Sequence, residues 1–330
     1  MAHTTDTHMF DSHLTIIEGA IADALAKAHL PPELAEPIAY TLDGGGKRLR
    51  PLLTVLAAEA CGASPHRAAP LAAAIEILHN FTLVHDDIMD RSPLRRGKPT
   101  VYVRWDESTA ILAGDTMMGI AYRLLSEHYD AETCRQLVAE FSAAFIEICI
   151  GQAEDIAFRY RPSVAMSDYT EMIARKTARL FATATASGAI VAGASDRTSQ
   201  ALRRFGHGLG MAFQIQDDVL DLFGEPQFGK QRGQDLREGK KTFIVLSLAD
   251  RCSSARALLE RYMHGEPIAS DADIERIATL CRQCGVLEEA QTTIDSYLDD
   301  AIAAIRRELP PSPARDLLVA AAEKNRTRTL

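Results

Sequence analysis

The chain has 330 residues, a formal net charge of −9 at pH 7 and 47% hydrophobic residues. The acidic balance argues against nucleic acid as a partner, while the apolar fraction is ample for a buried core. Charges interrupt every long apolar run, and the N-terminus has neither a basic region nor an apolar segment, so neither a membrane anchor nor a signal peptide is predicted.

The apolar pattern is helical along the chain, after a flexible tail expected at residues 1–10. Apolar residues recur every three or four positions over residues 71–90, 107–129 and 134–158, and alanine is abundant. Loops rich in Gly and Pro separate the helical runs, and none resembles a flexible linker. We therefore predict an all-α fold with about ten to thirteen helices, forming a single domain over residues 1–330.

The six cysteines lack the spacing of a disulfide framework and lie mostly inside apolar helical runs. This pattern favours a reducing compartment, so we expect a soluble, cytoplasmic protein. Cys281 and Cys284 form a lone CxxC pair, but a zinc site would need a second pair of ligands, and none is evident.

Two aspartate clusters of identical spacing are the most informative feature of the sequence. Both read D-D-x-x-D and lie 131 positions apart (217 − 86): Asp86, Asp87 and Asp90 form the first, and Asp217, Asp218 and Asp221 the second. On a helix, the first and last members of each cluster share one face, where like charges repel and apolar neighbours make the carboxylates costlier still. A bound cation removes that cost, and Mg²⁺ is the natural candidate because it binds carboxylates and phosphate oxygens together.

A solvated acidic helix face is the alternative for one such cluster in an acidic chain. Each cluster, however, is embedded in apolar sequence and is followed by a basic loop containing glycine, RSPLRRGKPTVY in the first case and FGEPQFGKQRGQDLREGKK in the second. A diphosphate held by metal ions between two carboxylate walls explains both features.

At this point the chain resembles the trans-isoprenyl diphosphate synthases of the polyprenyl synthetase family. The similarity runs from GGGKRLRP to GKQRGQDLREGKKT and includes LHNFTLVHDDIMD, RRGKPTV, GQAEDI, the pair Lys176–Thr177 and FQIQDDVLD. The resemblance implies the isoprenoid synthase fold, a helical bundle with a central active-site cavity, in a homodimer. It also implies that isopentenyl diphosphate is condensed head to tail with an allylic diphosphate, with three Mg²⁺ ions per active site when substrate is bound.

The resemblance assigns different roles to different motif residues. Direct metal ligands would be Asp86, Asp90 and Asp217, with Asp87, Asp218 and Asp221 acting beside them. The allylic diphosphate would be held by Arg95, Lys176, Lys230 and, as the weakest match, Lys240. Isopentenyl diphosphate would be held by Lys47, Arg50, His79 and Arg96. The carbonyl group of Thr177 and the side chain of Gln214 would lie near the carbocation, and Gln152 and Asp155 would line the cavity.

Phe81 lies five residues before Asp86, which is about 7.5 Å along a helix axis. It is either an ordinary core residue or the floor of the channel that receives the growing chain, and the two roles are compatible. In the resembling family a bulky aromatic here accompanies short products. Together with the small neighbour Thr82, it favours a C20 product, with C15 next.

Three alternatives stay open: a longer-chain polyprenyl synthase, a class I terpene cyclase, and a non-catalytic subunit of a heteromeric synthase. The full second D-D-x-x-D and the basic pocket for isopentenyl diphosphate count against the cyclase, and the complete set of acidic and basic residues counts against the subunit. Near the C-terminus, Arg326 and Arg328 would either close over the site or belong to a solvated tail.

Overall fold

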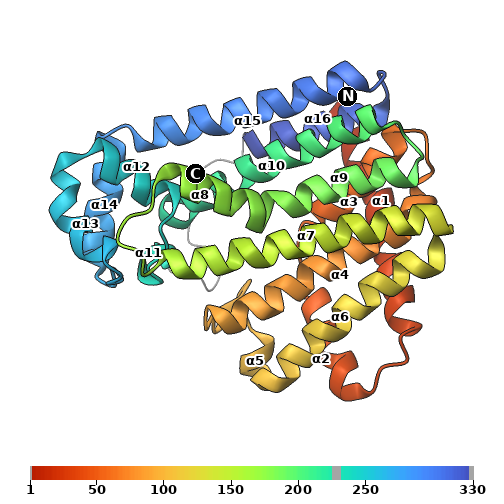
Figure 1. The fold of residues 1–330 in the computed structure, drawn as a ribbon, viewed down its shortest axis with the longest axis horizontal. Coiled ribbons are helices and arrows are strands. Elements are labelled where there is room, and N and C mark those ends of the chain that lie inside the picture. Colours follow the sequence, from red (N-terminus) through yellow and green to blue (C-terminus); the bar gives the residue numbers. More distant parts are fainter. Residues whose placement is uncertain (1, 225–231, 327–330) are drawn as a thin grey trace. The chain divides into compact units, whose positions relative to one another are not determined.

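The computed structural model describes residues 2–224 and 232–326, with the backbone alone for residues 2–9. Over these ranges the chain forms sixteen α-helices, one π-helical turn, one 3₁₀ turn and a two-stranded hairpin (Figure 1). The predicted all-α fold is confirmed. Helices outnumber the prediction partly because α5 (Val101–Arg104) and α11 (Gln234–Arg237) span a single turn each and leave no apolar period in the sequence.

The chain divides into two compact units, each built from three chain segments. Unit 1 contains residues 1–142, 180–204 and 304–320, and unit 2 contains residues 143–179, 205–303 and 321–330. The first aspartate cluster therefore belongs to unit 1 and the second to unit 2.

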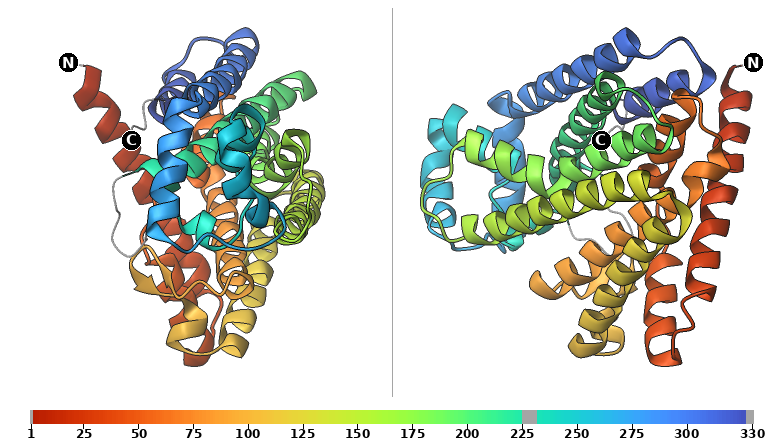
Figure 2. Two further views of the ribbon diagram at one scale, coloured as in Figure 1. Left: turned by 90° about the vertical axis from the view of Figure 1, so that its left-hand side faces the viewer. Right: turned by 45° about the vertical axis from the view of Figure 1, so that its right-hand side comes forward.

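Helix α4 (Pro65–Met89) is central to unit 1 and packs against α1, α3 and α6 (Figure 1 and Figure 2). Ser64 caps it by accepting from the backbone N–H of Arg67, and Pro65 fills the first turn, where a missing N–H costs nothing. Nearly every side chain from Ala68 to Leu78 is buried, as expected for a helix that is apolar on all sides.

The other helices of unit 1 surround α4 or follow it in the chain. They are α1 (Ala2–Ala26), α2 (Pro32–Leu42), α3 (Leu49–Ala60), α5, α6 (Glu107–His128) and nearly all of α9 (Arg179–Val191). Helix α1 already begins at Ala2, so the residues expected to form a flexible tail make up its first turns.

A hairpin that the sequence did not suggest follows α4. Its strands are β1 (Leu94–Arg95) and β2 (Lys98–Pro99), and Arg95 pairs with Lys98 across a two-residue turn. Both turn residues, Arg96 and Gly97, have positive φ angles of 53° and 77°, as a type I′ turn requires. The turn therefore places Arg96 at the tip of the hairpin, in a backbone conformation that a non-glycine residue rarely adopts.

Unit 2 carries most of the two 28-residue helices α7 (Ala131–Phe158) and α10 (Asp196–Phe223). Its shorter elements include α12 (Phe243–Arg251), which packs against α8 (Met166–Ile173) and α14 (Asp271–Gln283). The remaining elements are the π-helical turn (Ala174–Ala178), α11, the 3₁₀ turn (Ser253–Ala255), α13 (Arg256–Met263), most of α15 (Val286–Glu308) and the end of α16 (Pro313–Arg326).

The cysteines of unit 2 differ from the expectation of reduced thiols. Cys252, at the end of α12, forms a disulfide with Cys284, at the end of α14, with a Cα–Cα distance of 5.9 Å. Cys281, the other half of the CxxC pair, remains a free thiol in the core, where burial raises its pKa to about 12. The disulfide partners are 32 residues apart, a spacing that carries no recognisable pattern.

The expectation that charges interrupt every long apolar run is wrong for α7. This helix is long and apolar enough, by length and composition, to cross a membrane, and 33% of its most apolar window is buried. The observation is weak support for a membrane span, because core helices of soluble proteins satisfy the same criteria.

Candidate active site

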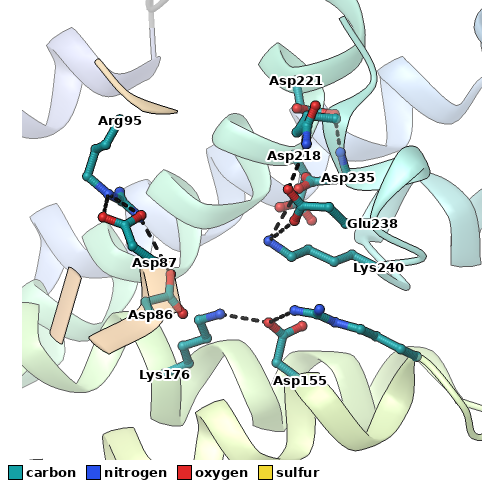
Figure 3. Close-up of polar contacts among 12 residues, drawn as sticks. Asp86, Asp87, Arg95, Asp155, Lys176, Asp218, Asp221, Asp235, Glu238 and Lys240 are labelled. Carbon is teal, nitrogen blue, oxygen red and sulfur yellow. Dashed lines mark hydrogen bonds and ion pairs between the residues drawn. The ribbon is translucent and has the colours of Figure 1, made fainter. Parts of the chain in front are cut away.

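The first aspartate cluster lies at the C-terminal end of α4, in unit 1. Asp86 and Asp87 belong to the last turn, and Asp90 caps it. The negative end of the helix dipole adds to the mutual repulsion of the carboxylates, so this position favours a cation. Arg95 offsets part of that charge: its Nε lies 2.8 and 3.0 Å from the two carboxylate oxygens of Asp87, and its Nη2 lies 3.7 Å from Asp86 (Figure 3).

Residues expected to hold isopentenyl diphosphate come together in unit 1. Nη1 of Arg50 lies 3.0 Å from Nε2 of His79, which links the GGGKRLRP loop to α4. The guanidinium of Arg96 packs against Gly46, where a Cβ atom would lie 3.1 Å from Nη1. Lys47, the next residue, is exposed. A loop glycine thus lets the hairpin tip approach the lysine-bearing loop, as basic residues around one anion would require.

An ion network around the buried side chain of Arg48 fixes the loop that carries Lys47. Arg48 has a left-handed backbone (φ 45°) and donates to Glu76 at 2.6 Å, to Glu18 at 2.7 Å and to the carbonyl oxygen of Leu42 at 2.6 Å. These partners come from α4, α1 and α2, so one side chain anchors the loop to three helices. Sequence reasoning missed this network, because the acidic partners lie in helical runs without a motif.

The arginines give this part of unit 1 a strongly positive field. Burial lowers the pKa of His79 well below its ordinary value, and the charges of Arg50, Arg95, Arg96 and Arg48 lower it further. His79 is therefore neutral at pH 7 and accepts or donates hydrogen bonds without adding charge. Arg48 and Arg95 are paired with carboxylates, so Arg50 and Arg96 are the guanidinium groups of this set that best suit a multiply charged anion beside the neutral imidazole.

The second aspartate cluster lies at the C-terminal end of α10, in unit 2. Asp218 is enclosed there and accepts hydrogen bonds from the hydroxyl group of Tyr169 at 2.7 Å, Nε2 of Gln214 at 2.9 Å and the backbone N–H of Phe243 at 3.0 Å. Gln214 in turn accepts from the hydroxyl group of Thr177 at 2.7 Å. The predicted site residues Thr177, Gln214 and Asp218 are thus joined in one hydrogen-bond chain.

The loop after α10 is tied back to the same cluster. The backbone N–H of Asp235 donates to the carboxylate of Asp221 at 3.1 Å (Figure 3), and that of Gly233 donates to the carbonyl oxygen of Asp221 at 2.9 Å. Asp217, the predicted direct metal ligand, is half-buried on the same helix end. Residues 233 and 235 of the basic loop that the sequence placed after the cluster are therefore in contact with the end of α10.

Lys176 and Thr177 lie in the π-helical turn, a widened turn that is frequent at functional sites. Nζ of Lys176 donates to Asp155 at 2.7 Å (Figure 3). Burial works to raise the pKa of Asp155, but neighbouring cations, Lys176 first, outweigh it and lower the pKa. Gly151 permits the contact, since a Cβ atom there would lie 2.5 Å from the backbone nitrogen of Lys176. This accounts for the glycine and the aspartate of the GQAEDI motif.

The remaining predicted lysines have different surroundings. Nζ of Lys240 lies 2.7 Å from Glu238 and 3.8 Å from Asp235 (Figure 3), so it is held near the second cluster. Its neighbour Lys241 is buried and donates to two backbone carbonyl oxygens, which gives it a structural role. Lys230 lies outside the described residues.

Arg326 belongs to α16 and not to a solvated tail. It pairs with Asp295 at 2.8 Å, Asp299 at 2.5 Å and Glu323 at 2.9 Å, all within unit 2. These contacts hold it against α15. Arg328 lies outside the described residues.

Phe81 is buried on α4, and its ring meets that of His85 edge-on at a centroid distance of 4.6 Å. His85 is seated against α6 at Gly114, where a Cβ atom would lie 2.3 Å from Nε2. The hydroxyl group of Thr82 donates to the carbonyl oxygen of His79 at 2.7 Å. Phe81 is thus a packed residue of unit 1, and its role as a channel floor stays a prediction.

The acidic residues fit Mg²⁺ by their chemistry. Carboxylate oxygens are the hard ligands that this ion prefers, and Mg²⁺ usually takes one or two carboxylates and completes its octahedron with water and substrate phosphates. Among the described side chains, those of residues 10–224 and 232–326, no group of three His, Cys, Asp or Glu that could hold a metal ion is found.

Comparison with known proteins defines the class. Residues 31–281 match the polyprenyl synthetase family. The chain is 41% identical over 284 residues to the geranylgeranyl diphosphate synthase of Methanosarcina mazei, covering 85% of this chain and 86% of that one. It is 38% identical over 323 residues to the geranylfarnesyl diphosphate synthase of Natronomonas pharaonis, covering 92% of each. The crystal structure of geranylgeranyl pyrophosphate synthetase from Pyrococcus horikoshii matches with a TM-score of 0.90 at 32% identity, over 100% of both chains.

The chain therefore belongs to the polyprenyl synthetase family, as its motifs indicated. It is a trans-prenyltransferase of isoprenoid biosynthesis, and the substrates of this family are isoprenyl diphosphates. Prenyl synthases of this family depend on Mg²⁺.

Proposed function

We propose that this chain condenses isopentenyl diphosphate head to tail with an allylic diphosphate and releases a short linear trans-prenyl diphosphate. The observation that carries the proposal is the cluster of arginines around the neutral His79 in unit 1, close in sequence and space to an aspartate cluster. Isopentenyl diphosphate keeps its diphosphate, so it needs a basic pocket without metal. The residues of that pocket are Lys47, Arg50, His79 and Arg96.

The allylic substrate loses its diphosphate first and leaves a carbocation. Negative charge develops on the leaving group, and four cationic side chains bind it: Arg95, Lys176, Lys230 and Lys240. Asp86, Asp90 and Asp217 would hold Mg²⁺, three ions in the full site, and bound Mg²⁺ would supply further positive charge at the leaving group. The double bond of isopentenyl diphosphate then attacks the cation, near the carbonyl group of Thr177 and Gln214, and the released diphosphate takes the proton.

The product is proposed to be the C20 diphosphate. Phe81, one and a half turns before Asp86 on α4, would stop the growing chain, and the small Thr82 leaves room beside it. A C25 product is the second candidate, because a relative that covers 92% of this chain is named for geranylfarnesyl diphosphate synthesis. A C15 product is the shorter alternative.

The test is elongation of defined primers. Purified protein receives Mg²⁺, isopentenyl diphosphate and, in separate reactions, the dimethylallyl, geranyl or farnesyl diphosphate primer, and the products are dephosphorylated and sized. We expect all three primers to be extended to C20. Absence of elongation from every primer contradicts the proposal, and a cyclic hydrocarbon in place of a linear alcohol indicates a cyclase.

We further propose that the protein is a homodimer that uses the exposed face of α7 in unit 2. Ile146 and Ile150 are 58% and 40% exposed, with Cys149 beside them. Ile150, Ala153 and Ala157 also line one side of an open pocket of about 650 Å³, and its wall also contains four charged side chains: Glu154, Arg161, Asp168 and Glu171. An exposed apolar stripe on one helix face, bordered by charged residues, fits the same face of a second copy.

Light scattering after size-exclusion chromatography tests the dimer. We expect the wild-type chain to elute as a dimer and Ile146→Glu to shift it toward monomer, whereas Asp300→Asn, at an exposed position of α15, leaves it unchanged. A monomeric wild type contradicts the proposal.

We also propose that the whole chain acts as one synthase domain in the cytoplasm without a heteromeric partner, so the purified chain is expected to be active alone.

A further inference from the structure

Tyr169 is a buried residue of unit 2 that no motif contains. It lies on α8, five residues before the π-helical turn, and is 1% exposed. Its hydroxyl group donates to Oδ2 of Asp218 at 2.7 Å, and its ring packs edge-on against Phe243 at 6.2 Å. The ring is therefore held in place by packing, and the hydroxyl group is aimed at the middle aspartate of the second cluster.

The carboxylate of Asp218 connects two parts of the proposed site. On one side, Oδ1 accepts from Gln214, which accepts from Thr177 in the π-helical turn. On the other side, Oδ2 accepts from Tyr169 and from the backbone N–H of Phe243. A hydrogen-bonded series of four side chains thus connects the π-helical turn with α8, in the order Thr177, Gln214, Asp218 and Tyr169.

The hydrogen bonds that hold Asp218 also affect the two aspartates beside it in the motif. Asp217 precedes it and Asp221 follows at the next turn of α10. A change in how Asp218 is held would therefore be passed to both neighbours through the helix backbone. Buried acceptors of this kind need their full complement of donors, and outer hydrogen bonds of this type orient metal ligands. Removing one donor loosens the carboxylate without touching a substrate-binding side chain.

We propose that Tyr169 is a positioning residue for the second aspartate motif, acting through Asp218 on the metal-dependent, allylic half of the reaction. The proposal rests on the proposed prenyl transfer. It assigns no contact between Tyr169 and substrate. The isopentenyl diphosphate pocket is built from unit 1, so we expect removal of the hydroxyl group of Tyr169 to leave the binding of isopentenyl diphosphate unchanged.

The first test is Tyr169→Phe, which keeps the ring and removes the hydroxyl group. We expect the Mg²⁺ concentration for half-maximal rate and the KM for the allylic diphosphate to rise roughly ten-fold, and kcat to fall by a similar factor. The KM for isopentenyl diphosphate should change less than two-fold. If Tyr169 served stability alone, Tyr169→Phe would lower the unfolding temperature, and the KM values for the two substrates would change by the same factor.

Tyr129→Phe is the matched control. Tyr129, in unit 1, donates to the carbonyl oxygen of Arg67 and accepts from the N–H of Leu71, so its variant also loses a partly buried hydroxyl group. Both variants should lose a few degrees of thermal stability, but only Tyr169→Phe should change the Mg²⁺ dependence. Equal Mg²⁺ dependence in the wild type and Tyr169→Phe overturns the inference, whereas a wild type without elongation activity overturns the proposed function.

A double-mutant cycle with Asp218→Ala keeps the inference testable if Tyr169→Phe folds poorly. Asp218→Ala removes the acceptor to which Tyr169 donates, so no buried carboxylate is left without a donor when the hydroxyl group is removed as well. If Tyr169 acts through Asp218, adding Tyr169→Phe to Asp218→Ala changes the rate and the Mg²⁺ dependence less than two-fold. A further ten-fold loss in the double variant shows an independent action of Tyr169 and overturns the inference.

Discussion

The middle aspartates of the two D-D-x-x-D clusters have the same sequence neighbourhood, and each is 4% exposed, yet they are held differently. Asp87, in unit 1, faces the guanidinium of Arg95 at 2.8 and 3.0 Å. Asp218, in unit 2, accepts its hydrogen bonds from neutral donors within the described part of the chain, with the hydroxyl group of Tyr169 the nearest at 2.7 Å.

The charge states of the two carboxyl groups follow from these partners. Burial raises the pKa of Asp87, and the hydrogen bond and charge of Arg95 oppose that rise. Burial, reinforced by the charge of Asp235, raises the pKa of Asp218 to about 7, against the hydrogen bonds it accepts. Identical motifs therefore do not fix a charge state; the neighbouring side chains do. Asp87 therefore has a cationic hydrogen-bond donor within unit 1, whereas the three donors to Asp218 in unit 2 are neutral.

The largest expected effect concerns the first aspartate of each cluster. Asp86→Asn and Asp217→Asn each replace a proposed metal ligand, and we expect kcat to fall on the order of 10³-fold in both cases, because stabilisation of the leaving group is lost. Steady-state kinetics at saturating Mg²⁺ measures this, with the surface variant Asp300→Asn as a control. Full activity of either variant would remove its cluster from the proposed metal site.

The middle aspartates should differ in stability. Asp87→Asn leaves the guanidinium of Arg95 with a weakened partner, and we expect a loss of roughly 2 kcal/mol in unfolding free energy. Asp218→Asn should cost less than about 1 kcal/mol, because the amide of Gln214 can turn over and Thr177 can donate or accept. Denaturant unfolding of both variants checks the difference. A larger loss for Asp218→Asn would mean that the neutral donors hold an ionised carboxylate.

The aromatic residues before the clusters extend the comparison to product length. Phe81 precedes Asp86 by five residues, and Phe213 precedes Asp217 by four. We expect Phe81→Ala to lengthen the product by at least one five-carbon unit. Phe81→Leu, whose side chain is larger than that of alanine, should keep most of the product at C20. Phe213→Ala, the matched change in unit 2, should keep the wild-type length. Unchanged length in Phe81→Ala would remove Phe81 from the floor.

The helices and the two clusters could be predicted because apolar periods and repeated motifs are local features of the sequence. The partners of those motifs could not. Tyr169 reaches Asp218 from 49 residues away, and Arg48 reaches Glu76 from 28 residues away, without a sequence signal at either end. The type I′ turn at Arg96 was missed because an arginine at positive φ contradicts local propensity. Long-range contacts and local strain are set by tertiary packing, which a single sequence does not display.

The smallest expected effect is the pH dependence of stability that arises because burial and the arginines of unit 1 lower the pKa of His79. Burial, followed by the charges of Arg50, Arg95 and two further arginines, lowers the pKa of His79 in the folded protein well below its ordinary value of 6.5. Below pH 6.5 the unfolded chain therefore binds the proton first. The contribution of His79 to stability is complete above that pH and is lost as the pH falls, by at most about 1.4 kcal/mol per pH unit.

His79→Gln isolates this effect, because the amide can still accept a hydrogen bond from Nη1 of Arg50 but does not titrate. The unfolding free energy of both proteins, measured between pH 7.5 and pH 5.5, should diverge as the pH falls, with the wild type losing more. A bound diphosphate would partly neutralise the arginines and so raise the pKa of His79, and the divergence should then shrink when isopentenyl diphosphate is present. Parallel pH curves without ligand would show that neither burial nor the arginine charges lower the pKa of His79 in the folded protein. The contrast between the cationic donor of unit 1 and the neutral donors of unit 2 would then rest on the partners of Asp87 and Asp218 alone.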